Sequence, residues 1–120
     1  MCHDRGSVTV WAAALAGLVW LGSAAALLYG SAVAERHRVE MAADLAALAA
    51  AVHVPDGVAS ACAAGARIAV RNGGSLRDCR VAGADVEVQV SSQVRLGGLG
   101  ALTAMARARA GPVPEVGDLP

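Results

Sequence analysis

The chain has 120 residues, enough for one small domain. Ten arginines balance ten acidic residues and there is no lysine, so no net basic charge indicates nucleic acid or an acidic partner surface. Apolar residues make up 56% of the chain, but Phe is absent and Ala and Val supply most of them, so a core would bury little area per residue. This composition argues against an independent globular enzyme and favours a chain that needs a membrane or partners.

Residues 6–34 form a run of 29 residues without a single charge. About 20 apolar residues cross a bilayer as a helix, and Trp11 and Tyr29 lie near the ends of the run, where aromatic side chains favour the interface. We therefore expect a short cytoplasmic N-terminus (residues 1–6) and a transmembrane helix (residues 7–34). A cleaved secretory signal is the alternative, because "GSAAA" and "GSAVA" offer small residues for cleavage, although the run is longer than a signal needs.

Two features of the sequence predict opposite orientations of this helix in the membrane. Arg5 precedes the apolar run and Arg36 and Arg38 follow it, and a count of positive charges places the C-terminal side inside the cell. Against this, the N-terminal flank is short and the C-terminal side carries a pair of cysteines. We give the cysteines more weight and expect a single-pass plasma-membrane protein whose C-terminal head is extracytoplasmic.

Small residues recur every four positions along the apolar run, a spacing that lets membrane helices approach closely. An alanine-rich segment also produces such spacings by chance, which is the alternative interpretation. The residues of this ridge are Gly22, Ala26, Gly30 and Ala34.

The charged turn after the apolar run is expected to mark the membrane exit, with the heads of Arg36 and Arg38 in water. No Gly or Pro occurs between Ser31 and Val54, and alanine has the best helix propensity, so the helix should continue as an alanine-rich rod over residues 35–53. A thin alanine stripe permits close packing by another helix, and a bulkier stripe (Leu45, Leu48, Val52) lies beside it. We therefore extend the predicted helix-packing surface from the ridge to Ala42, Ala46 and Ala49.

The segment "RGSVTVWAA", the apolar run and "RHRVEMAADLAALAAA" together resemble the N-terminal half of TadE/TadG-like proteins, which assemble the pilus of the tight-adherence secretion system. The usual element is an arginine, a few residues and then "AADAAALAGA"; here Arg38 precedes residues 42–51, "AADLAALAAA". Residues 106–112, "ARARAGP", resemble the end of the short actinobacterial branch encoded near helicase and secretion genes. The resemblance implies a pilin-like protein that packs against other membrane proteins of a secretion apparatus.

One departure from the prepilin pattern concerns processing. Type IV-like prepilins are cut after a glycine, and the fifth residue of the mature chain is a glutamate. The corresponding junction here is Gly6–Ser7, which makes Trp11 the fifth residue. An uncleaved membrane-anchored pseudopilin or assembly factor fits this sequence better than a processed filament subunit.

The distal half is expected to form a small α+β head over residues 56–111. Pro55, Asp56 and Gly57 have turn chemistry, and helical spacing predicts a helix over residues 57–72 that ends at "NGG". Alternating apolar and polar residues predict strands near 77–81 and 84–95. Residues 102–110 have a composition that favours helix but an alternation that suggests a third antiparallel strand, and residues 112–120 are expected to be a disordered tail.

Of the three cysteines, Cys62 on the predicted second helix and Cys79 on the first strand are the natural disulfide pair. Closing such a loop contributes about 3 kcal/mol in the chain-entropy model, which a small head without large apolar residues needs. Two buried free thiols are the alternative. Cys2 is left over, either as a lipidation site or as a bystander thiol.

The sequence contains no recognisable catalytic, cofactor or metal site. Its three histidines are scattered, and "RNGGS" and "RLGGLG" lack the lysine and the strand–loop–helix setting of a phosphate-binding loop. The leading hypothesis is therefore a non-enzymatic pilin-like component of a tight-adherence pilus or related secretion apparatus, with membrane lipid and other pilin-like or secretion-system membrane proteins as partners, and with no nucleic acid and no small-molecule substrate. The alternative is a small secreted or membrane-tethered binding protein with a signal-anchor.

Overall fold

The computed structural model describes residues 4–113. Cys2 and most of the predicted tail lie outside the described residues. The first helix, α1, runs from Asp4 to Val52 without interruption, as the absence of Gly and Pro between Ser31 and Val54 requires. The chain divides into two compact units, residues 1–34 and residues 35–120, which are described separately below.

In the first unit, every described side chain from Gly6 to Ala34 is exposed. The helix is apolar and long enough to cross a membrane by length and composition. Ser23 and Ser31 turn their hydroxyls back onto the carbonyls of Val19 and Leu28, at 2.8 Å each, so these polar groups are satisfied within the helix itself.

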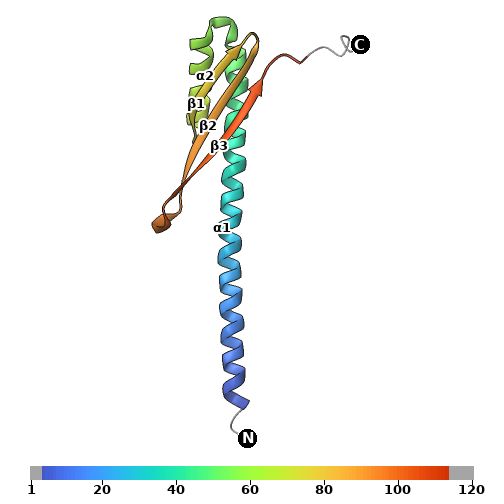
Figure 1. Cartoon of the computed structure of the whole chain (residues 1–120), viewed down its shortest axis with the longest axis vertical. Coiled ribbons are helices and arrows are strands. Elements are labelled where there is room, and N and C mark those ends of the chain that lie inside the picture. Colours follow the sequence, from blue (N-terminus) through green and yellow to red (C-terminus); the bar gives the residue numbers. More distant parts are fainter. Residues whose placement is uncertain (1–3, 114–120) are drawn as a thin grey trace, which may run out of the picture. The chain divides into compact units, whose positions relative to one another are not determined.

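The second unit contains the C-terminal part of α1, a 3-10 turn (Val54–Asp56), helix α2 (Val58–Arg71) and three strands (Figure 1). The strands are β1 (Ser75–Ala82), β2 (Asp85–Arg95) and β3 (Ala101–Ala110), with a second 3-10 turn (Gly97–Leu99) between β2 and β3. They form one antiparallel sheet in the order β1-β2-β3. The predicted α+β class is thereby confirmed, and the ambiguous residues 101–110 are a strand.

The core of the second unit lies between α1 and the sheet. Alternate residues of β2, namely Val86, Val88 and Val90, are fully or almost fully buried, and their partners across the ladder are the alanines of β3. They pack against one face of α1, which we call the inner face. The inner face consists of Val39, Ala42, Ala43, Ala46, Ala47 and Ala50, all at most 1% exposed.

Helices α1 and α2 approach each other closely at Gly65. A Cβ atom on Gly65 would lie 3.1 Å from the carbonyl oxygen of Ala46 and 3.4 Å from the Cβ of Ala50. Only small side chains on both helices permit such an approach. Ala61, Ala64 and Ala69 of α2 are buried on the same side.

The burial of the inner face corrects the predicted helix-packing surface. Ala42 and Ala46 have no exposed area, and Ala49 is half-buried, so the alanines expected to receive another protein's helix are covered by this chain's own sheet and α2. An alanine face lets any helix or sheet approach closely, and here the chain's own sheet and α2 occupy that face. Leu45, in the bulkier stripe beside these alanines, is exposed.

We predict that Ala46→Leu destabilises the second unit by about 1–3 kcal/mol, because Ala46 has no exposed area and the core around it has no room for the added volume. Ala63→Leu is the matched control, because Ala63 is exposed on α2. Unfolding of the full chain in detergent micelles should be followed by amide hydrogen exchange, since residues 35–120 contain no Trp, Tyr or Phe. Equal stability of the two variants would contradict the assignment of Ala46 to the core.

Candidate membrane-exit and assembly surfaces

Some of the charged residues at the membrane exit pair with one another on the surface of α1. Arg36 donates from Nε to Glu40 Oε1 at 3.1 Å, and His37 Nδ1 lies 3.4 Å from Glu40 Oε2. Both contacts are solvent-exposed, and exposed pairs one helical turn apart contribute about 0.3–0.5 kcal/mol. These exposed contacts are compatible with the role expected of Arg36, which is to keep this turn in water. That role stays a prediction.

Two other exit residues reach the head. The Ser92 hydroxyl, nearly buried at the end of β2, donates to Glu35 Oε1 at 2.7 Å. Arg38 lies over the α2–β1 turn, where a Cβ atom on Gly73 would be 3.1 Å from its Nη2. Gly73 also has a φ of +79°, so glycine is favoured there both by the backbone conformation and by the closeness of Arg38. The exit turn is therefore the place where one end of the sheet and one end of α2 meet α1.

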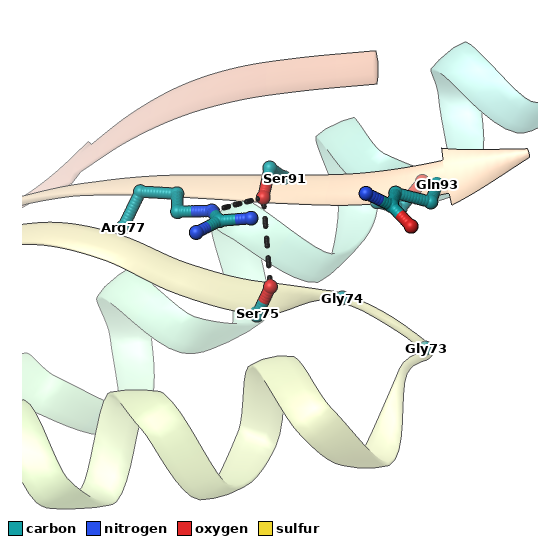
Figure 2. A pocket seen from close by; sticks show the side chains of 7 residues that line it. Gly73, Gly74, Ser75, Arg77, Ser91 and Gln93 are labelled. Atoms are coloured by element: carbon teal, nitrogen blue, oxygen red, sulfur yellow. Dashed lines mark hydrogen bonds between the residues drawn. The ribbon is translucent and has the colours of Figure 1, made fainter. Parts of the chain in front are cut away.

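A polar pocket of about 370 Å³ lies at this same end of the head (Figure 2). Arg77 donates from Nε to the buried Ser91 hydroxyl at 2.7 Å, and Ser75 lies 3.5 Å from the same oxygen. A register shift between Leu76 and Asp78 takes Arg77 out of the regular ladder. No sequence signal indicated this pocket, because a bulge depends on the pairing of two strands. It is lined by Gly73, Gly74, Ser75, Arg77, Ser91, Ser92 and Gln93.

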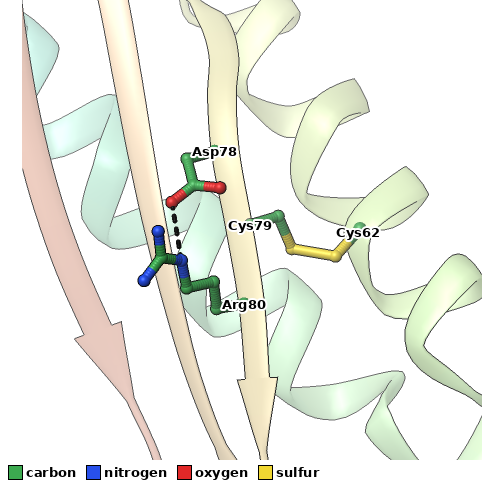
Figure 3. Close-up of a disulfide and its surroundings, with 4 residues drawn as sticks. All are labelled: Cys62, Asp78, Cys79 and Arg80. Carbon is green, nitrogen blue, oxygen red and sulfur yellow. Dashed lines mark ion pairs between the residues drawn. A yellow bond between two sulfur atoms is a disulfide. The ribbon is translucent and has the colours of Figure 1, made fainter.

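A disulfide joins Cys62 of α2 to Cys79 of β1, as expected from the sequence (Figure 3). The two cysteines are 17 positions apart, and the bond fastens α2 to the edge strand of the sheet. On the neighbouring residues, Arg80 Nε pairs with Asp78 Oδ2 at 3.0 Å on the exposed surface. The disulfide is a covalent constraint that holds α2 against β1, and the small side chains between these two elements do not supply such a constraint.

At the other end of the sheet, Arg109 of β3 pairs with Asp85 at the start of β2. The hydrogen bond to Asp85 and its charge raise the pKa of Arg109 above its ordinary value, although the group is exposed. Gly111 lies against the same carboxyl group, where any Cβ would clash. The charges at this end are therefore paired across the sheet.

On the side of α1 away from the core, four large apolar side chains form an exposed stripe, which we call the outer stripe. Their exposed fractions run from 47% to 75%. They are spaced by four, three and four residues, which is the spacing of the contact positions in paired helices. The outer stripe consists of Met41, Leu45, Leu48 and Val52.

The ridge in the apolar run is also unoccupied by the described part of the chain. A Cβ atom added at Gly22 or Gly30 would meet no atom within 4 Å, and Ala26 and Ala34 are exposed. Gly6 and Ser7, which correspond to the cleavage junction of prepilins, lie in the first turns of α1, where the Thr9 hydroxyl donates to the Gly6 carbonyl at 3.0 Å. Among the described residues, no group of three or more His, Cys, Asp or Glu side chains is placed to hold a metal ion.

The N-terminal helix is similar to a known protein family. Residues 6–53 match a family model described as "Putative Flp pilus-assembly TadE/G-like". The match covers α1 from the start of the apolar run to its end and stops before α2. It confirms the resemblance to TadE/TadG-like proteins, while the actinobacterial branch stays a prediction. No curated protein and no solved structure matches the chain.

Proposed function

On the premise that its N-terminal helix is a TadE/G-like pilus-assembly segment, we propose that the chain is a non-enzymatic, membrane-anchored, pilin-like component of a tight-adherence pilus or related secretion apparatus. Support comes from the exposed surfaces of α1. The described residues of the apolar run are exposed, as contact with lipid or other membrane helices requires, and the outer stripe is exposed in the same way for a helix outside the bilayer.

The observation that carries the proposal is the outer stripe. A soluble helix normally buries its large apolar side chains and exposes its small or polar ones. Here the head covers the alanines and leaves Met41, Leu45, Leu48 and Val52 in solvent. Partner helices would pack on the ridge through small residues and on the outer stripe through large ones.

An uncleaved N-terminus fits this role. The fifth residue after the Gly6–Ser7 junction is Trp11, which offers no carboxylate to a neighbour's amine. The chain would therefore contribute to assembly through side-to-side helix packing and not through the charge pairing of processed pilins. This favours a pseudopilin or assembly factor over a major filament subunit.

The proposed orientation rests on the disulfide. Structural disulfides persist in oxidising compartments, so Cys62–Cys79 supports an extracytoplasmic head in spite of the arginines that follow the apolar run. In a Cys2→Ser background, an impermeant maleimide applied to intact cells should label the chain only after reduction. Labelling without reduction would contradict the disulfide, and protection of both thiols after reduction would contradict the orientation.

We predict that Leu48→Glu weakens association with the secretion-system membrane proteins while leaving the head folded. Loss of one buried leucine at an interface costs about 2 kcal/mol, or roughly a thirty-fold weaker association. Co-purification from membranes measures the association, and amide hydrogen exchange of the full chain measures the fold. Ala63→Glu places the same charge on the exposed face of α2 and is the control.

Unchanged recovery of partners with Leu48→Glu would contradict the assembly role of the outer stripe. Intact-mass analysis of the native chain tests the alternative. A mass that corresponds to a chain starting near residue 35 would favour the signal-anchor alternative, because cleavage would remove the ridge together with the apolar run.

A further inference from the structure

The polar pocket at the start of β1 holds the buried polar side chains of the head. Ser91 is 2% exposed and Ser92 is 7% exposed, and within the part of the chain that the structure describes these two are the buried polar residues. Both line the pocket, where they end the alternation of buried valines in β2. A buried hydroxyl is costly unless it is hydrogen-bonded, so the two serines indicate a place that is built from polar contacts.

The irregularity in β1 gives this pocket its charged group. Because the register shifts between Leu76 and Asp78, Arg77 is the extra residue and leaves the ladder. Its Nε donates to the Ser91 hydroxyl at 2.7 Å. Figure 2 shows the guanidinium group of Arg77 and the amide of Gln93 on either side of that hydroxyl along β2. The hydrogen bond to Ser91 thus holds one edge of the guanidinium group, and the pocket lies against the rest of it.

The groups around the pocket are mainly hydrogen-bond donors. A guanidinium group has five N–H bonds, and Ser91 uses one of those of Arg77. Within residues 4–113 Arg77 forms no ion pair, since the neighbouring Asp78 pairs with Arg80. The amide of Gln93 and the hydroxyl of Ser75 also line the pocket and add donors. A ligand with negatively charged oxygen atoms matches this set of groups.

The charges around the pocket favour an anion with a single negative charge. Arg38 lies over the lining residue Gly73, and Glu35 accepts the hydroxyl of the lining residue Ser92 at 2.7 Å. The charges of Arg38 and Glu35 offset each other, so Arg77 leaves one net positive charge. A carboxylate has one negative charge and two oxygen atoms that match two parallel N–H bonds of a guanidinium group. A phosphate group carries about 1.5 to 2 negative charges at neutral pH, which exceeds the charge of the site.

We propose that this pocket binds the carboxylate group of an aspartate or glutamate side chain on a partner protein. The carboxylate accepts N–H bonds from Arg77, whose position is fixed by Ser91. A carboxylate fills only part of the volume of about 370 Å³, and the amide of Gln93 can both donate to and accept from the peptide groups of the segment that carries it. No residue of the outer stripe lines the pocket, so the site is independent of the assembly role proposed for that stripe.

The test uses the purified full chain in uncharged detergent micelles, with the native disulfide intact. N-acetylglutamate amide, whose only charge is the side-chain carboxylate, is titrated at neutral pH and followed by backbone amide chemical shifts. N-acetylglutamine amide is the matched neutral ligand. Arg77→Gln removes the charge of the site, and Arg107→Gln is the control variant, because Arg107 is exposed on β3 and does not line the pocket.

The proposal predicts saturable shifts at residues 73–77 and 91–93 with the glutamate ligand and none with the glutamine ligand. Arg77→Gln should weaken binding roughly tenfold or more, because hydrogen bonds from a charged group are lost. Arg107→Gln should bind as the native chain does. Absence of shifts in the native chain, equal shifts with both ligands, or equal weakening in both variants would overturn the proposal.

Two further ligands test the charge and the source of the carboxylate. Inorganic phosphate should bind more weakly than the glutamate ligand, and tighter binding would overturn the assignment of a singly charged ligand. Acetate should also bind more weakly, because it has no peptide group for Gln93 to contact. Equal affinity for acetate would overturn the assignment to a protein segment. None of these results bears on the co-purification experiment, since the micelles contain no partner protein.

Discussion

The close approach of α1 to α2 at Gly65, where the backbone of Ala46 lies directly against the glycine, is the constraint on which the rest of the second unit depends. Because no side chain separates the two helices there, α2 can lie directly against α1 and leave room for the sheet on the same inner face. Burial of alanine and valine yields little free energy per residue, so the fold gains from many close contacts and from one covalent constraint, Cys62–Cys79. The absence of aromatic residues after Tyr29 is consistent with this close packing.

This packing determines which surfaces remain for other molecules. Since the sheet and α2 occupy the alanines, the large apolar residues of α1 are left outward, and the same helix carries a folded unit on one side and an unoccupied stripe on the other. The Ser92 hydroxyl of β2 donates to Glu35, which ties the sheet to the first residue of the second unit. The proposed role in a membrane assembly would use the outer stripe, while the head covers the opposite side of the same helix.

Much of this architecture followed from local sequence features. The continuation of α1 past the apolar run follows from the lack of Gly and Pro between Ser31 and Val54. The strand β2 follows from its alternation of valine with polar residues, and the cysteine pairing from the elements that carry the two cysteines. The burial of the inner face in this chain's own core could not be predicted from the sequence, because an alanine stripe can pack against a partner's helix as well as against elements of its own chain. The Ser92–Glu35 bond joins residues 57 positions apart, and the displacement of Arg77 depends on strand register. Both arise only when distant segments meet.

The central claim, that the alanines of α1 belong to this chain's own core and the outer stripe does not, is tested most directly by cysteine accessibility along the helix. Single cysteines at Ala42, Ala46, Leu45 and Leu48, each in a Cys2→Ser background with the disulfide intact, are reacted with a maleimide in purified full-length protein. The account predicts slow reaction at positions 42 and 46 and fast reaction at positions 45 and 48. Fast reaction at position 46 together with protection at position 48 would contradict it.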